Sequence, residues 1–418
     1  MIVTLYPSSS PSFIAHHGEK GARTYLRLAS QGVEMQKTLA KQLGMGRDKE
    51  EEEGGEGGRV GGGGGGLVEE GSMYVCCRGE EDAFWNEFLL LRRLMLPEVE
   101  DGSEDGREDG REEPIRWCEK EEVVAMHGSQ AGFTRGIFFP QDAIIDSTSY
   151  TQALIQAAVG TGRALLLLNC PAVCGIEEEE EDEEGREGGV FLSFQDTKSI
   201  VKLKVPRVVL ATGGFFLSPP PLAGILRPCF SYLAAVPPPP FRPPSRPTPN
   251  FFTFGFTHDW CVVASGHVRV SGEDHFSALK PPRRKARARA LVEWVRARYG
   301  GREGERREGR IWVAASRLEG EGEGGEGGGG REEEVVVSAR HGVYSETPDA
   351  LPLLGSVRKE VREGGRARLV YCVGCNAWGE ASLTYAASLV PGLLGYRELS
   401  VDEEEAARLM SIRRFSGA

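Results

Sequence analysis

Three stretches of the chain carry apolar residues at the spacing of an amphipathic helix, namely residues 25–43, 147–159 and 283–299. Asp146 is a suitable N-cap for the second stretch, and the glycines of 160–162 end it. The third stretch is basic on its polar face, which favours a solvated surface helix over a nucleic-acid contact. The apolar positions are Leu28, Val33, Met35 and Leu39 in the first, Tyr150 and Leu154 in the second, and Leu291, Val295 and Tyr299 in the third.

Short apolar runs alternate with these helices along the chain. Residues 164–168 and 205–211 have the length and the composition of buried strands. Residues 251–270 are rich in aromatic and β-branched side chains, which predicts antiparallel strands of a second layer. A further strand at 369–373 leads through a glycine turn into a helix of small residues at 381–389. Alternating strands and helices predict an α/β fold.

Composition separates this folded part from long insertions. Hydrophobic residues make up 40% of the chain, and 56 glycines and 24 prolines exceed what packed structure needs. Runs of Glu and Gly bury too little apolar surface to offset the entropy of ordering them, so we expect disorder there, whereas the proline run favours an extended loop. The insertions are 49–66, 98–113, 177–188, 319–334 and, for the prolines, 237–249.

The net charge of −12 belongs to the insertions and not to the folded part. Residues 98–113 carry nine acids and two arginines (−7) and residues 177–187 nine acids and one arginine (−8), which leaves about +3 for the rest. A nearly neutral surface does not attract nucleic acid or an anionic membrane. No run of 18 apolar residues exists, so we expect no membrane span.

Nine cysteines without regular spacing indicate free thiols, and therefore the cytoplasm or an organelle matrix. Cys372 and Cys375 form the single Cys-x-x-Cys pair. A zinc site needs a second pair, so we interpret these two as small buried side chains at a strand end and expect no metal.

Two turns are candidates for ligand binding. Val208-Val209-Leu210 leads to Gly213 and Gly214, where a backbone without Cβ atoms can approach a flat or anionic ligand, although tight turns look the same. Residues 374–379 join a strand to a helix, which places free N–H groups and a positive helix end at the turn.

These segments resemble the D-amino-acid-oxidase-like (DAO) family of FAD-dependent oxidoreductases. The motifs follow one another in the family's order and spacing, over about residues 7–48 and 114–395 with the insertions set aside. They are the block 136–159, Ala211-Thr212-Gly213-Gly214, Gly272-Glu273-Asp274 after Arg269-Val270-Ser271, Thr347-Pro348-Asp349-Ala350-Leu351-Pro352-Leu353-Leu354-Gly355, and Gly374-Cys375-Asn376-Ala377-Trp378-Gly379.

The resemblance implies a doubly wound, Rossmann-like FAD-binding domain from 1–48, 114–236 and 335–418, with an interleaved mixed-sheet substrate domain mainly in 251–317. It also implies FAD as cofactor and a small amine or amino acid as substrate. By position, the first glycine turn would lie near the ribose and phosphates of FAD, and the second turn near the isoalloxazine. The cofactor-binding residues so implied are Thr212, Gly213, Gly214, Gly355, Gly374, Ala377, Trp378 and Gly379.

Two departures from the family pattern shape the expectations. The sequence shows neither the opening strand nor the G-x-G-x-x-G loop that binds the pyrophosphate, and its opening resembles the family only from just after that first unit. The polyglycine run 61–66 is no substitute for the loop, because it follows no strand and opens no helix. We therefore expect an FAD-binding domain without its first β-α-β unit, in an N-terminally incomplete chain. Where many members have Gly-x-Arg-Pro, whose arginine clamps a substrate carboxylate, Tyr344 replaces the arginine. Arg269 is a second substrate-side candidate and has an equally good structural interpretation.

The resemblance thus predicts an enzyme that transfers hydride to FAD from a C–H bond. The atom next to that bond is expected to be nitrogen, with oxygen as the less favoured alternative. A free amine needs no acid or base, so no catalytic side chain is assigned. The alternatives are a non-catalytic remnant that no longer binds FAD and a polyproline scaffold that depends on residues 237–249.

Overall fold

The computed structural model of the protein describes residues 4, 8–46, 66–96, 113–127, 132–168, 173–178, 188–195, 200–213, 222, 224–236, 248–262, 267–276, 284–299, 338–356, 367–377 and 379–415. The helices are α1 (Ser10–Gln42), α2 (Glu81–Met95), α3 (Lys120–His127), α4 (Ser147–Gly160), α5 (Arg284–Tyr299), α6 (Glu380–Leu393), α7 (Val401–Leu409) and the 3-10 helix η4 (Ile412–Phe415).

The described strands belong to four sheets. Eight form the largest sheet, in the order β14 (Ser338–Glu346), β10 (Arg227–Val236), β13 (Val268–Phe276), β12 (His258–Val262), β11 (Asn250–Thr253), β2 (Ser72–Cys77), β4 (Phe133–Phe139) and β3 (Arg116–Cys118). A three-stranded sheet has the order β15 (Leu353–Ser356), β16 (Leu369–Val373) and β9 (Val208–Leu210). A second contains β6 (Val173–Glu178), β7 (Val190–Gln195) and β8 (Ile200–Val205), and β1 (Leu67–Val68) pairs with β5 (Ile144–Ile145).

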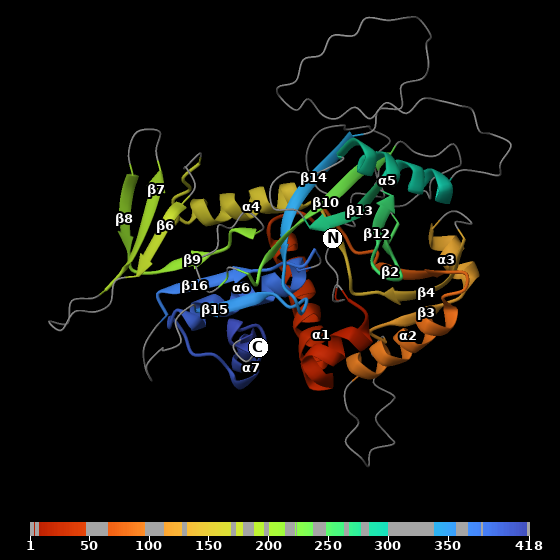
Figure 1. Cartoon of the computed structure of the whole chain (residues 1–418), viewed down its shortest axis with the longest axis horizontal. Helices are drawn as coiled ribbons and strands as arrows, with labels where there is room; N and C mark the ends of the chain where they lie inside the picture. Colours follow the sequence, from red (N-terminus) through yellow and green to blue (C-terminus); the bar gives the residue numbers. More distant parts are fainter. Residues whose placement is uncertain are drawn as a thin grey trace, which may run out of the picture.

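Helix α5 covers one face of the eight-stranded sheet (Figure 1). Side chains of a strand alternate between faces, and every second residue of β10 from Phe230 to Val236 joins one buried cluster with Leu291 and Val295 of α5. The helix predicted at 283–299 is confirmed with its apolar side buried. The other face of β10 carries Cys229 and its alternate neighbours, and Tyr344 of β14, opposite Cys229, lies on that face.

The long helix α1 runs between the eight-stranded sheet and the sheet of β15, β16 and β9, and it packs against α6 (Figure 1). At their crossing Gly32 leaves no room for a side chain, because a Cβ atom there would lie 2.0 Å from the carbonyl oxygen of Ala381. The helix predicted at 25–43 is confirmed but begins earlier, at Ser10, with a non-helical residue at Gly18. Close contact with α1 therefore fixes the N-terminal turn of α6.

The predicted helix after Asp146 is also confirmed. The Asp146 carboxylate accepts hydrogen bonds from the backbone N–H groups of Thr148 and Ser149 at 3.1 and 3.3 Å, as an N-cap does. Of the buried positions expected on this helix, Tyr150 alone is buried.

The strand predicted at 164–168 is wrong. These residues form no strand, and Leu165, Leu166, Leu167 and Leu168 are 85, 44, 59 and 72% exposed. An apolar run becomes a strand only where a neighbouring strand offers hydrogen bonds, and the described residues supply none beside it. None of the described helices combines the length and apolar character needed to cross a bilayer.

Several insertion boundaries differ from those expected. The eight-stranded sheet takes strands from 72–77, 116–118, 133–139, 227–236 and 338–346 in addition to those between 250 and 276, and the division of the chain into the two expected domains stays a prediction. Glu177 and Glu178 belong to β6 instead of an insertion. Thr248, assigned to the proline loop, is buried and accepts a hydrogen bond from Val262 N–H at 2.9 Å. The remaining insertion residues, 49–65, 98–112, 179–187, 237–247 and 319–334, lie outside the described residues.

Candidate functional site

Two glycine turns meet at one edge of the three-stranded sheet. Strands β9 and β16 run parallel with Leu210 opposite Tyr371, so their carboxyl ends lie at the same edge. β9 leads to Thr212 and Gly213, and β16 leads to the turn that opens α6. Ligands of open α/β sheets bind outside the carboxyl ends of the strands. The fold therefore brings together the two segments that the sequence marked for ligand binding.

Ser345, at the end of β14, contacts both turns. Its hydroxyl donates to the Gly213 carbonyl oxygen at 3.4 Å, and its carbonyl oxygen accepts from Asn376 N–H at 3.1 Å. The residue is 2% exposed. Ser345 thus connects the edge of the eight-stranded sheet to the two turns. No local pattern in the sequence predicted this role.

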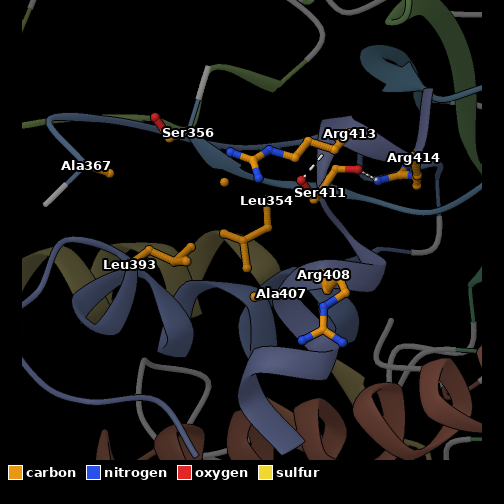
Figure 2. A pocket seen from close by; sticks show the side chains of 10 residues that line it. Leu354, Ser356, Ala367, Leu393, Ala407, Arg408, Ser411, Arg413 and Arg414 are labelled. Carbon is orange, nitrogen blue, oxygen red and sulfur yellow. Dashed lines mark hydrogen bonds between the residues drawn. The ribbon is translucent and has the colours of Figure 1, made fainter. Parts of the chain in front are cut away.

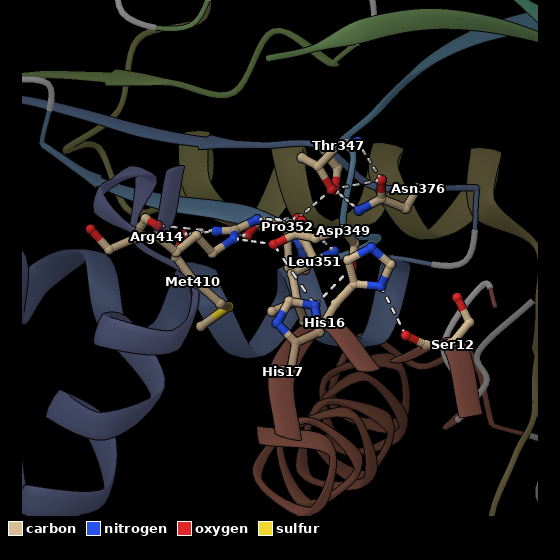
Figure 3. Close-up of polar contacts among 12 residues, drawn as sticks. Ser12, His16, His17, Thr347, Asp349, Leu351, Pro352, Asn376, Met410 and Arg414 are labelled. Carbon is tan, nitrogen blue, oxygen red and sulfur yellow. Dashed lines mark hydrogen bonds and ion pairs between the residues drawn. The ribbon is translucent and has the colours of Figure 1, made fainter. Parts of the chain in front are cut away.

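Asn376 fixes the shape of the second turn (Figure 3). Its side-chain oxygen accepts from the backbone N–H and the hydroxyl of Thr347 at 2.7 and 3.1 Å, and its amide donates to the Gly374 carbonyl oxygen at 2.8 Å. Asn376 and Ala377 both have left-handed backbone angles, with φ of 50° and 64°. Two such residues in succession store strain that the surrounding bonds must hold, a feature common at functional sites.

The turn ends at Gly379, the N-cap of α6. Because glycine has no side chain, it makes no side-chain hydrogen bond to the first N–H groups of the helix. A Cβ atom at Gly379 would lie 2.2 Å from the Cys375 carbonyl oxygen, so only glycine fits. The helix N-terminus presents its first N–H groups and the positive end of the helix dipole to the turn, which favours a ligand with negative charge.

The remaining predicted cofactor residues fall in three places. Thr212, Gly213 and Ala377 are exposed at the sheet edge. Gly214 and Trp378 lie outside the described residues. Gly355 lies within β15, opposite Tyr371, and borders a different cavity of about 550 Å³ beside the C-terminal helices α7 and η4 (Figure 2).

Tyr344 lies in acidic surroundings. Its hydroxyl is 2.9 Å from a carboxylate oxygen of Asp274 and 2.9 Å from one of Glu346. One hydroxyl proton serves one carboxylate at a time, so the group retains negative charge. Burial, and secondarily Asp274, raise the pKa of Tyr344 above its usual range, and burial also raises the pKa of Glu346. The Asp274 and Glu346 side chains that hydrogen-bond to this hydroxyl are carboxylates, and neither can bind a substrate carboxylate as an arginine does.

Arg269 is far from Tyr344 although both lie on the same sheet. Arg269 pairs with Ala235 of β10, and Tyr344 pairs with Cys229. Six residues along a strand correspond to roughly 20 Å. The two substrate-side candidates therefore do not form one binding site.

Asp349, from the Thr-Pro-Asp segment, is tied to the C-terminal end of the chain (Figure 3). Arg414 binds its two carboxylate oxygens through Nε at 2.6 Å and Nη2 at 3.0 Å. His17 Nε2 lies 2.9 Å from the Asp349 carbonyl oxygen. Burial raises the pKa of this carboxyl, but the bonds to Arg414 outweigh it and hold the pKa below its usual range. Asp349 thus positions the loop next to Thr347, and neither Arg414 nor His17 was expected to take part.

Cys372 and Cys375 are protonated thiols, because burial raises the pKa of Cys372 to about 11 and that of Cys375 above its usual value. Among the residues that the structure describes, no group of His, Cys, Asp and Glu side chains could hold a metal ion.

Comparison with known proteins adds to this geometry. The structure is similar to glycine oxidase from Geobacillus kaustophilus, with a TM-score of 0.57 and 18% identity over 90% of this chain and 80% of that one. It is also similar to L-proline dehydrogenase from P. horikoshii, with a TM-score of 0.60 and 14% identity over 94% and 84%. L-amino acid deaminase from Proteus myxofaciens gives 0.58 and 14% over 93% and 80%.

No curated protein matches the chain significantly. The family profile described as FAD dependent oxidoreductase (DAO) matches residues 69–390, which is most of the chain. This match includes both glycine turns and strand β14, whose Ser345 contacts both turns. The solved structures share the mixed α/β fold. The chain therefore belongs to the DAO family of FAD-dependent oxidoreductases.

Proposed function

We propose that this protein oxidises a C–H bond next to an amine nitrogen, with FAD as the hydride acceptor. The observation that supports the proposal most is the convergence of β14, β9 and β16 at Ser345, because the end of β14 that carries Tyr344 meets the two glycine turns there. The similar solved structures named glycine oxidase, L-proline dehydrogenase and L-amino acid deaminase support an amine or amino-acid donor.

The described residues fit the flavin end of FAD. The tight turn requires glycine at Gly379, and the N-terminus of α6, which no side chain caps, suits the negative charge that a flavin gains on reduction. Gly374 and Ala377 would hold that end, and Thr212 and Gly213 the adjoining part. Gly66, the last residue of the polyglycine run, leads into strand β1 and not into a helix, so it lacks the helix N-terminus that a phosphate loop uses.

FAD, when bound, supplies the acceptor for a hydride. The protein's own contribution is to orient the donor carbon and to keep water away from it. Tyr344 and Ser345 are neighbours on β14, so both lie at the end of the strand that meets the turns, although their side chains leave opposite faces of the sheet. A substrate that arrives as the free amine needs no further proton acceptor, and no catalytic acid or base is proposed.

The charge around Tyr344 favours an amine donor without a carboxylate. Asp274 and Glu346 would repel a carboxylate and attract a cation. In the members that carry an arginine at this place, a bidentate pair takes the carboxylate, and Tyr344 offers a single hydrogen bond at most. An amino-acid donor is the second candidate, favoured by the names of the similar structures.

The test is anaerobic bleaching of the FAD-loaded full chain by N-methylbutylamine and by sarcosine, which differ in the carboxylate. We expect faster bleaching by the amine. In Tyr344→Arg alone, Asp274 and Glu346 would pair with the new guanidinium. Use of sarcosine should therefore improve about tenfold only when Asp274→Asn and Glu346→Gln accompany it.

Arg340→Ala is the control for a second source of positive charge, since Arg340 lies on β14 opposite Leu233 of β10. Fast bleaching by sarcosine that persists in all these variants would contradict the role given to Tyr344. A full chain that takes up no FAD in an equilibrium titration would refute the proposed function and favour the non-catalytic alternative.

A further inference from the structure

Strand β13 contains one extra residue near its end. Its register against β10 pairs Gly272 with Tyr232 and His275 with Phe230, so three residue steps on β13 match two on β10. The two residues between Gly272 and His275 therefore form a β-bulge. A bulge of this kind bends the strand and changes which of the following side chains point to each face of the sheet.

The bulge decides which face Asp274 takes. Val270 faces α5, and in a regular strand the residues two and four positions further on would do the same, so Asp274 would point at that helix. Because of the extra residue, His275 takes the α5 face instead, and its ring stacks on that of Phe230. Asp274 is turned to the opposite face, where its carboxylate accepts a hydrogen bond from the Tyr344 hydroxyl at 2.9 Å.

Arg287 of α5 holds the bulge from the covered face of the sheet. Its Nη1 donates to the Glu273 carbonyl oxygen at 2.6 Å and lies 3.5 Å from Glu273 Oε2. Glu273 has a left-handed φ of 57°, which a residue with a side chain adopts only at a cost in free energy, so contacts from outside the strand must hold it there. A charged donor on the Glu273 carbonyl oxygen restricts the backbone directly before Asp274.

We propose that Arg287 is a positioning residue for the oxidation: by holding the bulge at Glu273 it aims the Asp274 carboxylate toward Tyr344, where that carboxylate binds the amine group of the donor. The inference rests on the proposed function, because it takes the donor to lie at Tyr344. Asp274 is exposed, so a donor can reach its carboxylate, which accepts hydrogen bonds from an amine and repels a second carboxylate. Arg287 contacts the bulge from the opposite face and acts through Asp274.

The experiment is anaerobic bleaching of the FAD-loaded full chain by N-methylbutylamine at increasing concentration. It gives the limiting bleaching rate and the donor concentration at half that rate. Arg287→Met keeps most of the side-chain volume and removes the charge and the donors. We expect it to raise the half-maximal concentration at least about fivefold and to leave the limiting rate within about twofold, because it weakens donor binding and not hydride transfer. Arg287→Lys keeps a charged donor and should restore most of the affinity.

Asp274→Asn removes the charge that Arg287 is proposed to aim. It should raise the half-maximal concentration by a similar factor, and adding Arg287→Met should raise it further by less than about twofold, because both residues act through one contact. The two factors would multiply if Arg287 only supported the fold. Arg289→Met is the matched control, since Arg289 is exposed two residues further along α5, and it should change neither quantity by more than about twofold.

Thermal unfolding shows whether each variant folds, and if Arg287→Met does not, the same comparison is made with Arg287→Gln. The inference alone is overturned if N-methylbutylamine bleaches the flavin and the half-maximal concentration is unchanged by the loss of Arg287, or if the effects of the two substitutions multiply. A chain that binds FAD and is not bleached by the amine at all would refute the proposed function, and this inference with it.

Discussion

Replacing Arg414 by Met tests whether the C-terminal segment holds the loop at the candidate site. The methionine keeps most of the side-chain volume and removes the charge and all donors. Asp349 and Arg414 are 9 and 13% exposed at their side chains, so water replaces the lost bonds poorly. Arg414 also donates to four carbonyl oxygens, those of Leu351, Pro352, Met410 and Ser411, at 2.7 to 3.2 Å.

Removal of one partner from a buried ion pair costs about 3 to 5 kcal/mol, because the other charge is left without compensation. The residual exposure of this pair and the nearby His17, whose Nε2 is 3.8 Å from Asp349 Oδ2, favour the lower end. We therefore expect Arg414→Met to lower the free energy of unfolding by about 3 kcal/mol. Adding Asp349→Asn should restore about 1 to 2 kcal/mol, since it removes the stranded charge.

The free energy of unfolding is measured by urea denaturation at neutral pH, with tryptophan fluorescence and circular dichroism as independent probes. Arg296→Met, on the exposed side of α5, is the control and should change it by less than about 0.5 kcal/mol. Because the pKa of Asp349 is held below its unfolded value, the pair stabilises the protein above pH of about 4 and this contribution is lost as the pH falls through the folded pKa. A loss below about 1 kcal/mol, or a double variant as unstable as the sum of the two single ones, would refute the reasoning.

Two further predictions concern other parts of the fold. Gly32→Ala should lower the free energy of unfolding by about 2 to 3 kcal/mol in urea denaturation, because its Cβ would lie 2.0 Å from the Ala381 carbonyl oxygen. The control Gly160→Ala, with open space around it, should change the free energy of unfolding little. Equal effects of the two substitutions would contradict the packing of α1 on α6. Burial raises the pKa of Asp142 to about 7, so the free energy of unfolding should decrease as the pH rises from about 4 to about 7. Asp142→Asn should remove this dependence of the free energy of unfolding on pH. A dependence that survives the substitution would assign it to other groups.

Local sequence signals predicted the elements that depend on neighbouring residues. The cap at Asp146, the strand at 369–373 and the glycine turn that follows it are where the sequence placed them. Such features follow from side-chain spacing, capping and backbone freedom within a few residues. The order of the motifs was also enough to indicate the family, and the family match confirms it.

The sequence alone misassigned or missed what depends on distant segments. Residues 164–168 have the composition of a strand, but no described strand pairs with them, so the leucines remain exposed. The spacing of Arg269 and Tyr344 was decided by the register of β13, β10 and β14 and could not be read from either motif.

The same holds for the residues that join the site together. Ser345 contacts Gly213 across 132 positions of the chain, and Arg414 contacts Asp349 across 65. Nothing in the residues next to them marks these contacts, because they arise only when separate sheets and helices pack. Local periodicity and motifs in the sequence determined helices α1, α4, α5 and α6, the turn before α6 and the family, whereas packing between remote segments decided which residues share a site.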